Sequence, residues 1–147
     1  MNALLERLYQ PKAGYHVLRL SVSAMMLFHG IAKLRAGTED IEGLLATWGL
    51  PKLLVAGVYV GEVVAPLLAL SGVLVGISAL IMAINMLFAI ALAHSVDVFS
   101  IAASGGWGIE LQALYLFGSL ALALLTPSPA KTRSVKLPSG HSAKRTG

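Results

Sequence analysis

The sequence predicts an all-α protein: a polytopic membrane four-helix bundle with a short interfacial helix in its first outer loop. Two observations lead to this fold class. Hydrophobic residues make up 56% of the 147-residue chain and charged residues only 12%, about half the charge of an average soluble domain. Four apolar stretches approach the roughly 20 residues that a helix needs to cross a bilayer. The length allows one compact unit.

The four stretches follow one another along most of the chain. They span Tyr15–Leu34, Lys52–Leu70, Val73–Ala93 and Gly108–Leu125. Basic residues precede the first, as in a signal peptide, but it contains His29 and Lys33 and no convincing cleavage site follows, so we expect a retained helix. We divide the chain into an N-terminal flank (1–14), a transmembrane domain (15–126) and a disordered basic tail (127–147).

Basic residues predict the orientation of the bundle. Arg7, Lys12 and Arg19 lie at its start, and five more Lys and Arg residues lie in the tail. We therefore expect both termini in the cytoplasm and a multi-pass protein of the bacterial inner membrane. These flanks also account for the net charge of +4, and no aromatic-interleaved basic patch exists. The expected contact is the lipid bilayer, not nucleic acid.

The first outer loop predicts a short amphipathic helix. Thr38 can cap its start, and the acidic residues that follow favour the positive end of a helix. Apolar residues recur at helical spacing over 41–48, Gly49 suits the position past the last turn, and Pro51 prevents continuation. We expect this helix to lie at the membrane interface. A plain polar loop is the alternative.

Four ionisable residues lie inside stretches that otherwise predict lipid-buried helix. They are His29, Lys33, Glu62 and Glu110. A charge at mid-bilayer costs roughly 2.5–3.5 kcal/mol on insertion scales. The alternating helix directions place three of them in the outer half of the membrane and Glu62 near the middle, where they can meet. His94 joins the outer layer, but Asn85 is half a turn out of phase with it, so the two face one centre only if that helix bends.

The second helix is the most informative. Gly57 and Gly61 form a GxxxG pair, which permits close helix approach. Pro66 removes the hydrogen bond to the carbonyl of residue 62. Glu62 then presents both a carboxyl group and a freed carbonyl. A polar pocket could use both groups, and a kink patched by a water molecule is equally consistent.

The chemistry that fits these residues best is a proton-coupled or quinone-type site. The chain has no cysteine, which removes iron–sulfur ligation and c-type haem attachment by this chain. A quinone site needs an apolar cleft, a titratable group, a donor to a carbonyl oxygen and stacking aromatics. The candidates are Lys33, Glu62, Glu110 and His29 for catalysis, with Tyr59, Trp107 and His94 as quinone contacts. Trp107 and Glu110 share a stripe with Leu114 and Phe117.

Several alternatives stay open at this point. Lys33 can form a purely structural ion pair with Glu62 or Glu110. Haem ligation by His29 and His94 is possible in principle. A metal site from His and Glu residues is conceivable, but no tight ligand motif supports it, and we predict none.

At these residues the chain resembles the DoxX family of small four-helix bacterial inner-membrane proteins, from about Leu18 to Leu125. The matching segments are Phe28–Lys33, Gly49–Pro51, Glu62, Ala93–His94 and Gly106–Glu110. Their order and spacing, rather than any single motif, carry the resemblance. Two features depart from the pattern: Pro66 replaces a small residue, often Gly, and the basic tail after Pro127 is longer.

The resemblance implies a redox-associated membrane subunit, because the family takes its name from a subunit linked to quinone-dependent respiratory and thiosulfate oxidation. It implies that Lys33, Glu62 and Glu110 are the family's polar positions. We therefore expect a quinone-linked subunit acting with redox partner proteins. The alternatives are a non-catalytic anchor or assembly subunit, and a small proton-coupled permease that forms a homo-oligomer.

Overall fold

The computed structural model describes residues 8–103 and 105–127, and within them the protein is built from helices. The elements are α2 (Pro11–Ala36), α3 (Glu39–Thr47), η1 (Lys52–Leu54), α4 (Val55–Tyr59), η2 (Val60–Val64), α5 (Ala65–Ser71), α6 (Val75–Ala93), η3 (Asp97–Phe99) and α7 (Glu110–Leu125). The all-α class is confirmed. The predicted tail after Pro127 lies outside the described residues.

Three helices are long and apolar enough to cross a membrane. They are α2, the continuous helix Lys52–Ser71 that runs from η1 through α5, and α6. The 16-residue α7 is a shorter apolar helix. The observed helices begin and end within four residues of the predicted stretches. The crossing of the bilayer by α7 stays a prediction.

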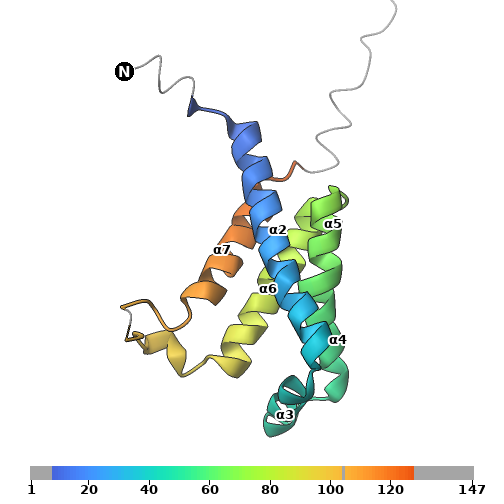
Figure 1. Ribbon diagram of the computed structural model, residues 1–147, viewed down its shortest axis with the longest axis vertical. Helices are drawn as coiled ribbons and strands as arrows, with labels where there is room; N and C mark the ends of the chain where they lie inside the picture. Colours follow the sequence, from blue (N-terminus) through green and yellow to red (C-terminus); the bar gives the residue numbers. More distant parts are fainter. Residues whose placement is uncertain (1–7, 104, 128–147) are drawn as a thin grey trace, which may run out of the picture.

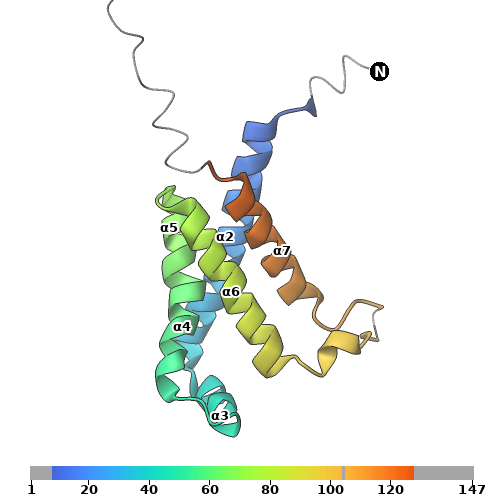
Figure 2. The ribbon, with the colours of Figure 1, turned by 180° about the vertical axis from the view of Figure 1, so that it is seen from behind.

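The long helices run in alternating directions (Figure 1). α2 runs away from the N-terminus, the helix Lys52–Ser71 returns, α6 runs parallel to α2, and α7 returns again. The first and last described residues and the turn between α5 and α6 thus share one end, here called the terminal end. α3 and the segment between α6 and α7 lie at the opposite, loop end (Figure 2).

The apolar core occupies the half of the molecule nearer the terminal end. Ala69 is close to the end of α5, Val75 begins α6, and Leu122 lies in the last turns of α7; all three are buried. Met26 and Met82 fill the space between these helices, at 1% and 0% exposure. Close apolar packing therefore separates the terminal end from the polar residues described below.

The first loop contains the expected short helix. Thr38 precedes α3 as its N-cap residue, although its side chain makes no capping hydrogen bond. Gly49 follows the helix with a φ of +65°, the left-handed conformation that glycine adopts without strain. Buried Leu45 holds α3 against the molecule, and Lys52 Nζ pairs with Glu42 Oε2 at 2.7 Å. The position of α3 at a membrane interface stays a prediction.

Candidate functional site

The site is built on a widened turn of the second long helix. η2 is a π-helical segment, and Glu62 lies at its centre. Pro66 has no N–H, and in a regular α-helix its ring would collide with the carbonyl of residue 62. The backbone here instead closes a wider turn, with Ala65 N–H donating to Val60 O. Single π-helical turns are frequent at functional sites. The effect expected of Pro66 therefore takes the form of a local π turn around Glu62.

Two glycines bring the neighbouring helices against this turn. A Cβ atom at Gly30 on α2 would overlap the carbonyl of Glu62, and a Cβ atom at Gly61 would overlap the side chain of Asn85 on α6. Gly57 differs, because a Cβ atom there would meet nothing within 4 Å. The close approach expected of the GxxxG pair is thus made by Gly61 and not by Gly57.

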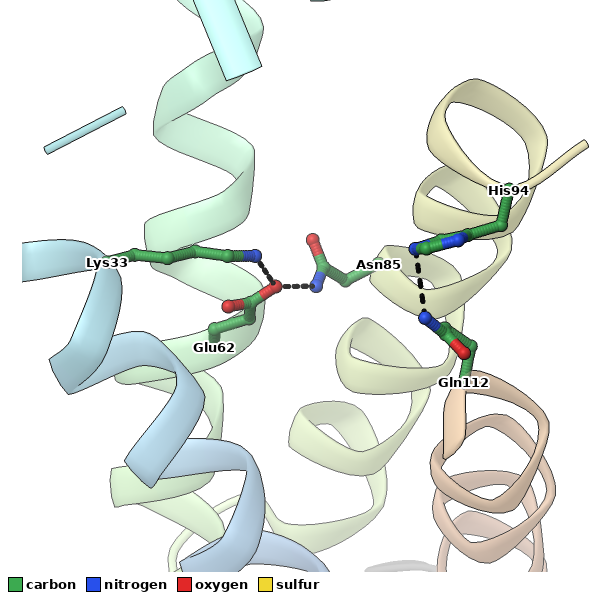
Figure 3. Close-up of polar contacts among 5 residues, drawn as sticks. All are labelled: Lys33, Glu62, Asn85, His94 and Gln112. Carbon is green, nitrogen blue, oxygen red and sulfur yellow. Dashed lines mark hydrogen bonds and ion pairs between the residues drawn. The ribbon is translucent and has the colours of Figure 1, made fainter. Parts of the chain in front are cut away.

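A polar cluster forms where the three helices meet (Figure 3). Lys33 Nζ donates to Glu62 Oε1 at 2.5 Å, and Asn85 Nδ2 donates to the same oxygen at 3.2 Å. The side chain of Glu62 is 3% exposed and that of Lys33 is 35% exposed. Glu62 Oε2 is buried and has no hydrogen-bond partner among the described residues. An unmet buried acceptor costs free energy, so this oxygen has bonding capacity to offer.

A cavity of about 540 Å³ lies beside the cluster. Its walls come from α2, α3, η1, α4, η2 and α6, and most of the lining side chains are apolar. The polar lining residues are Lys33, Asp40, Glu62, Asn85 and His94. The apolar wall residues Val60, Ile84 and Phe88 are 41%, 44% and 58% exposed, so the cavity opens on the flank of the helices.

A second, smaller cavity of about 140 Å³ lies between α2, η2, α6 and α7. Lys33, Glu62 and His94 line both cavities, and His29 lines the smaller one. The exposed His29 ring contacts Tyr115 edge to face, with ring centroids 5.5 Å apart. Of the residues predicted from the sequence, these four therefore lie around one centre. Tyr59, Trp107 and Glu110 line neither cavity.

The structure does not bring Glu110 or Trp107 to the cluster, because α7 turns Glu110 outward and Trp107 lies in the loop before α7. Glu110 is exposed and makes no ion pair with any described residue. The Trp107 indole N–H donates to Val98 O at 2.6 Å within the loop. Leu114 and Phe117, on the same stripe, are 64% and 61% exposed. The inward face of α7 instead carries Ala113, Tyr115, Ser119 and Leu122.

Two amides were not among the predicted site residues. Asn85 completes the hydrogen bonding of Glu62 Oε1, and Gln112 Nε2 lies 2.9 Å from His94 Nε2. Each is the single Asn or Gln of a mostly apolar helix, which is the sequence signal that points to it. Asn85 and His94 line the same cavity although the helical phase predicted otherwise. His94 is the C-cap residue of α6, with a φ of −127°, so helical phase does not govern it.

Metal ligation finds no geometric support within the part of the chain that the structure describes. No group of three or more His, Cys, Asp or Glu side chains there lies close enough to hold a metal ion. Glu62 is instead paired with Lys33 and Asn85, and His94 with Gln112.

The comparison with known protein families gives the family of this chain. The family model of DoxX matches residues 14–95, more than half of the chain. The chain belongs to the DoxX family. The matched residues run from α2 to just past His94, so they include Lys33, Glu62 and Asn85 and leave α7 outside. No curated protein and no solved structure matches the chain. With three helices able to span a bilayer, this DoxX protein is an integral membrane protein.

Proposed function

We propose that this DoxX protein is a quinone-linked redox subunit of a bacterial inner membrane, with both termini in the cytoplasm. One observation carries the proposal. The Lys33–Glu62 pair and Asn85 line a largely apolar cavity, and Glu62 Oε2 is buried with no partner among the described residues. Mostly apolar pockets with a few convergent polar groups are the usual form of small-molecule sites.

The donors left on Lys33 and Asn85 suit a ligand with acceptor oxygens, and the unpartnered Glu62 Oε2 suits the hydroxyl of the reduced quinol. The Lys33 ammonium carries three N–H donors and the Asn85 amide carries two. Each gives one to Glu62 Oε1, which leaves donors for a ligand oxygen. A quinone carbonyl is such an acceptor, and its ring and isoprenoid chain match the apolar walls.

The opening of the cavity suits a ligand dissolved in the bilayer. The half-exposed wall residues Val60 and Phe88 belong to η2 and α6, the helical segments on either side of the opening. On a membrane-spanning helix this flank faces acyl chains. A lipophilic ligand would enter sideways between these helices, while α3 covers the loop end of the cavity with Ile41 and Leu44.

A bound quinone supplies the redox chemistry, which takes up or releases two electrons and two protons. This chain would bind the quinone and exchange protons with it. Lys33 and Asn85 hold the carbonyl oxygen, and Glu62 exchanges a proton at Oε2 while Oε1 stays paired with Lys33. The chain has no cysteine to ligate an iron–sulfur cluster. We therefore assign electron delivery to a partner protein.

The test is the quinone content of the protein purified in mild detergent. We expect a stoichiometric amount of isoprenoid quinone in the wild-type protein and its loss in Glu62→Gln. Gly57→Leu would also lose it, because Gly57 lines the large cavity and a Cβ atom there meets no other atom within 4 Å. Gly14→Leu is the matched control, since Gly14 is equally open but distant from the cavity.

The same experiment separates this function from a non-catalytic anchoring role. The pair and Asn85 tie three helices together, which is the observation that favours an anchor. An anchor would carry no quinone in any variant, and Gly57→Leu would leave assembly with its partners intact. That pair of results would contradict the redox proposal.

A further inference from the structure

The smaller cavity adjoins the Lys33–Glu62 pair, as the large one does, but lies between α2, η2, α6 and α7. Glu62 thus lines both a mainly apolar space and a smaller space with a higher share of polar lining. Gln112 on α7 and His94 at the end of α6 line the smaller space. A volume of about 140 Å³ has room for roughly five water molecules at the volume they occupy in the liquid.

His94 is held at both ring nitrogens. His94 Nδ1 lies 3.1 Å from Asp97 Oδ2, and Gln112 Nε2 lies 2.9 Å from His94 Nε2 (Figure 3 shows the second contact). An ionised carboxylate only accepts, so Nδ1 carries the hydrogen that Asp97 receives. Nε2 is then the basic nitrogen and accepts from the Gln112 amide. Asp97 therefore fixes the tautomer in which the basic nitrogen lies toward the smaller cavity.

We propose that the smaller cavity is a water-filled proton passage between Glu62 and the loop end of the molecule, with His94 as its relay and Asp97 as its outer group. A proton leaving the Glu62 carboxyl group crosses cavity water to His94 Nε2. The Gln112 amide rotates to present its oxygen to the new N–H. The Nδ1 proton then passes to Asp97, whose side chain is 42% exposed, and on to bulk water. Proton uptake follows the same steps in reverse.

The opposite direction is closed by tight packing, in which the buried hydroxyls of Ser23, Ser78 and Ser119 line neither cavity. Ala65, Met82 and Leu122 are all 0% exposed and fill the molecule between Glu62 and the terminal end. The titratable groups that line the two cavities around His94 are Lys33, His29, Asp40, Glu62 and Tyr115. Of these, only Glu62 combines a place in both cavities with an unpaired buried oxygen among the described residues. Protons thus move between Glu62 and the loop end of the molecule, not between Glu62 and the terminal end.

The inference rests on the proposed function, because Glu62 has a proton to exchange when chemistry in the large cavity takes one up or releases one. It is tested on the full chain in lipid nanodiscs. After a rapid drop in pH, infrared spectroscopy follows the carboxyl band of Glu62, which is identified by its loss in Glu62→Gln. We expect His94→Phe to slow the protonation of Glu62 on the order of a hundredfold.

Three further variants make the result specific. Added imidazole should restore the rate in His94→Ala, which a merely structural role of His94 would not allow. His16→Phe should leave the rate unchanged, because His16 is exposed near the start of α2, toward the terminal end. A wild-type rate in His94→Phe, a slowed rate in His29→Phe alone, or no imidazole rescue would overturn the proposal.

Quinone content, measured on the same samples, separates the two proposals. Quinone retained in His94→Phe with an unchanged protonation rate would reject the passage and leave the quinone site standing. Absence of quinone from the wild type, with a slowed rate in His94→Phe, would reject the quinone site and leave the passage standing.

Discussion

At the scale of single residues, the Lys33–Glu62 pair is unequal in its surroundings. Glu62 is almost fully buried, whereas a third of the Lys33 side chain is exposed. A buried charge that loses its partner is strongly destabilising, while a long, partly exposed lysine can move its ammonium toward water. The two residues should therefore respond differently to removal of the partner.

A double-mutant cycle tests this asymmetry. We expect Lys33→Met to lower the free energy of unfolding by about 2–3 kcal/mol, because it leaves the Glu62 carboxylate with only Asn85. Glu62→Gln should cost about 1 kcal/mol, because the amide oxygen still accepts from a partly exposed lysine. Unfolding in mixed micelles gives both values and the coupling. Equal single losses that add without coupling would contradict the pairing.

The sequence predicted Lys33 and Glu62 because a charge inside an apolar helix is costly unless it has a partner or a use. It did not predict which partner Lys33 takes, since Glu62 and Glu110 were equally eligible. That choice depends on the rotation of α7 about its axis. Its small residues Ala113 and Ser119 face inward, where they allow close packing, and this rotation turns Glu110 outward. Single-helix periodicity does not contain that information.

At the scale of helices, the bounds of the apolar stretches were predictable, because bilayer length and the punctuating Gly and Pro residues fix them. The π turn at η2 was only partly predictable. Pro66 indicates a lost hydrogen bond, but whether the helix kinks or widens depends on the packing of α2 against residue 62. Gly30 supplies that packing, since no side chain separates α2 from the Glu62 carbonyl.

Two glycine substitutions should therefore have opposite effects. Gly30→Ala should destabilise the protein by about 2–3 kcal/mol, because its Cβ atom would overlap the backbone of Glu62, which cannot move freely. Gly57→Ala should be neutral or stabilise it by up to about 1 kcal/mol, because alanine is the better helix former and the position is open. Thermal denaturation in detergent measures both. Equal effects would show that α2 does not contact η2 closely.

Replacement of the proline tests the origin of the π turn. Pro66→Ala restores an N–H that can donate to the carbonyl of residue 62, which favours a regular α-helix over the wider turn. We expect helix content and folding to be kept while the Lys33–Glu62 coupling falls, because Glu62 rotates about the helix axis. Circular dichroism and the double-mutant cycle, repeated in this background, measure the two quantities. Unchanged coupling would mean that Pro66 does not position Glu62.

At the scale of the whole molecule, the alternating helices place both described ends of the chain together (Figure 1). The large cavity lies toward the loop end, because α3 lines it and Lys33 enters it from the last turn of α2. With the terminal end in the cytoplasm, as the basic flanks predict, the cavities lie in the outer half of the membrane. The arrangement of directions was predictable from an even number of apolar stretches. The cavities were not, because they depend on how the helices pack.

Cysteine labelling tests the orientation in a chain that has no native cysteine. Val96 is 82% exposed at the loop end, and Ser71 is exposed at the terminal end. A membrane-impermeant maleimide added to intact spheroplasts should label Val96→Cys at once and Ser71→Cys only after permeabilisation. The reverse pattern would place the termini outside.

Photolabelling with a photoreactive quinone analogue in native membranes tests the central claim most directly, because it reports where the ligand lies. The account predicts adducts on α4, η2 and α6, at cavity residues such as Val58, Ile84 and Phe88, with protection by unlabelled quinone and loss in Gly57→Leu. Adducts along the exposed stripe of α7, unchanged by unlabelled quinone, would contradict it.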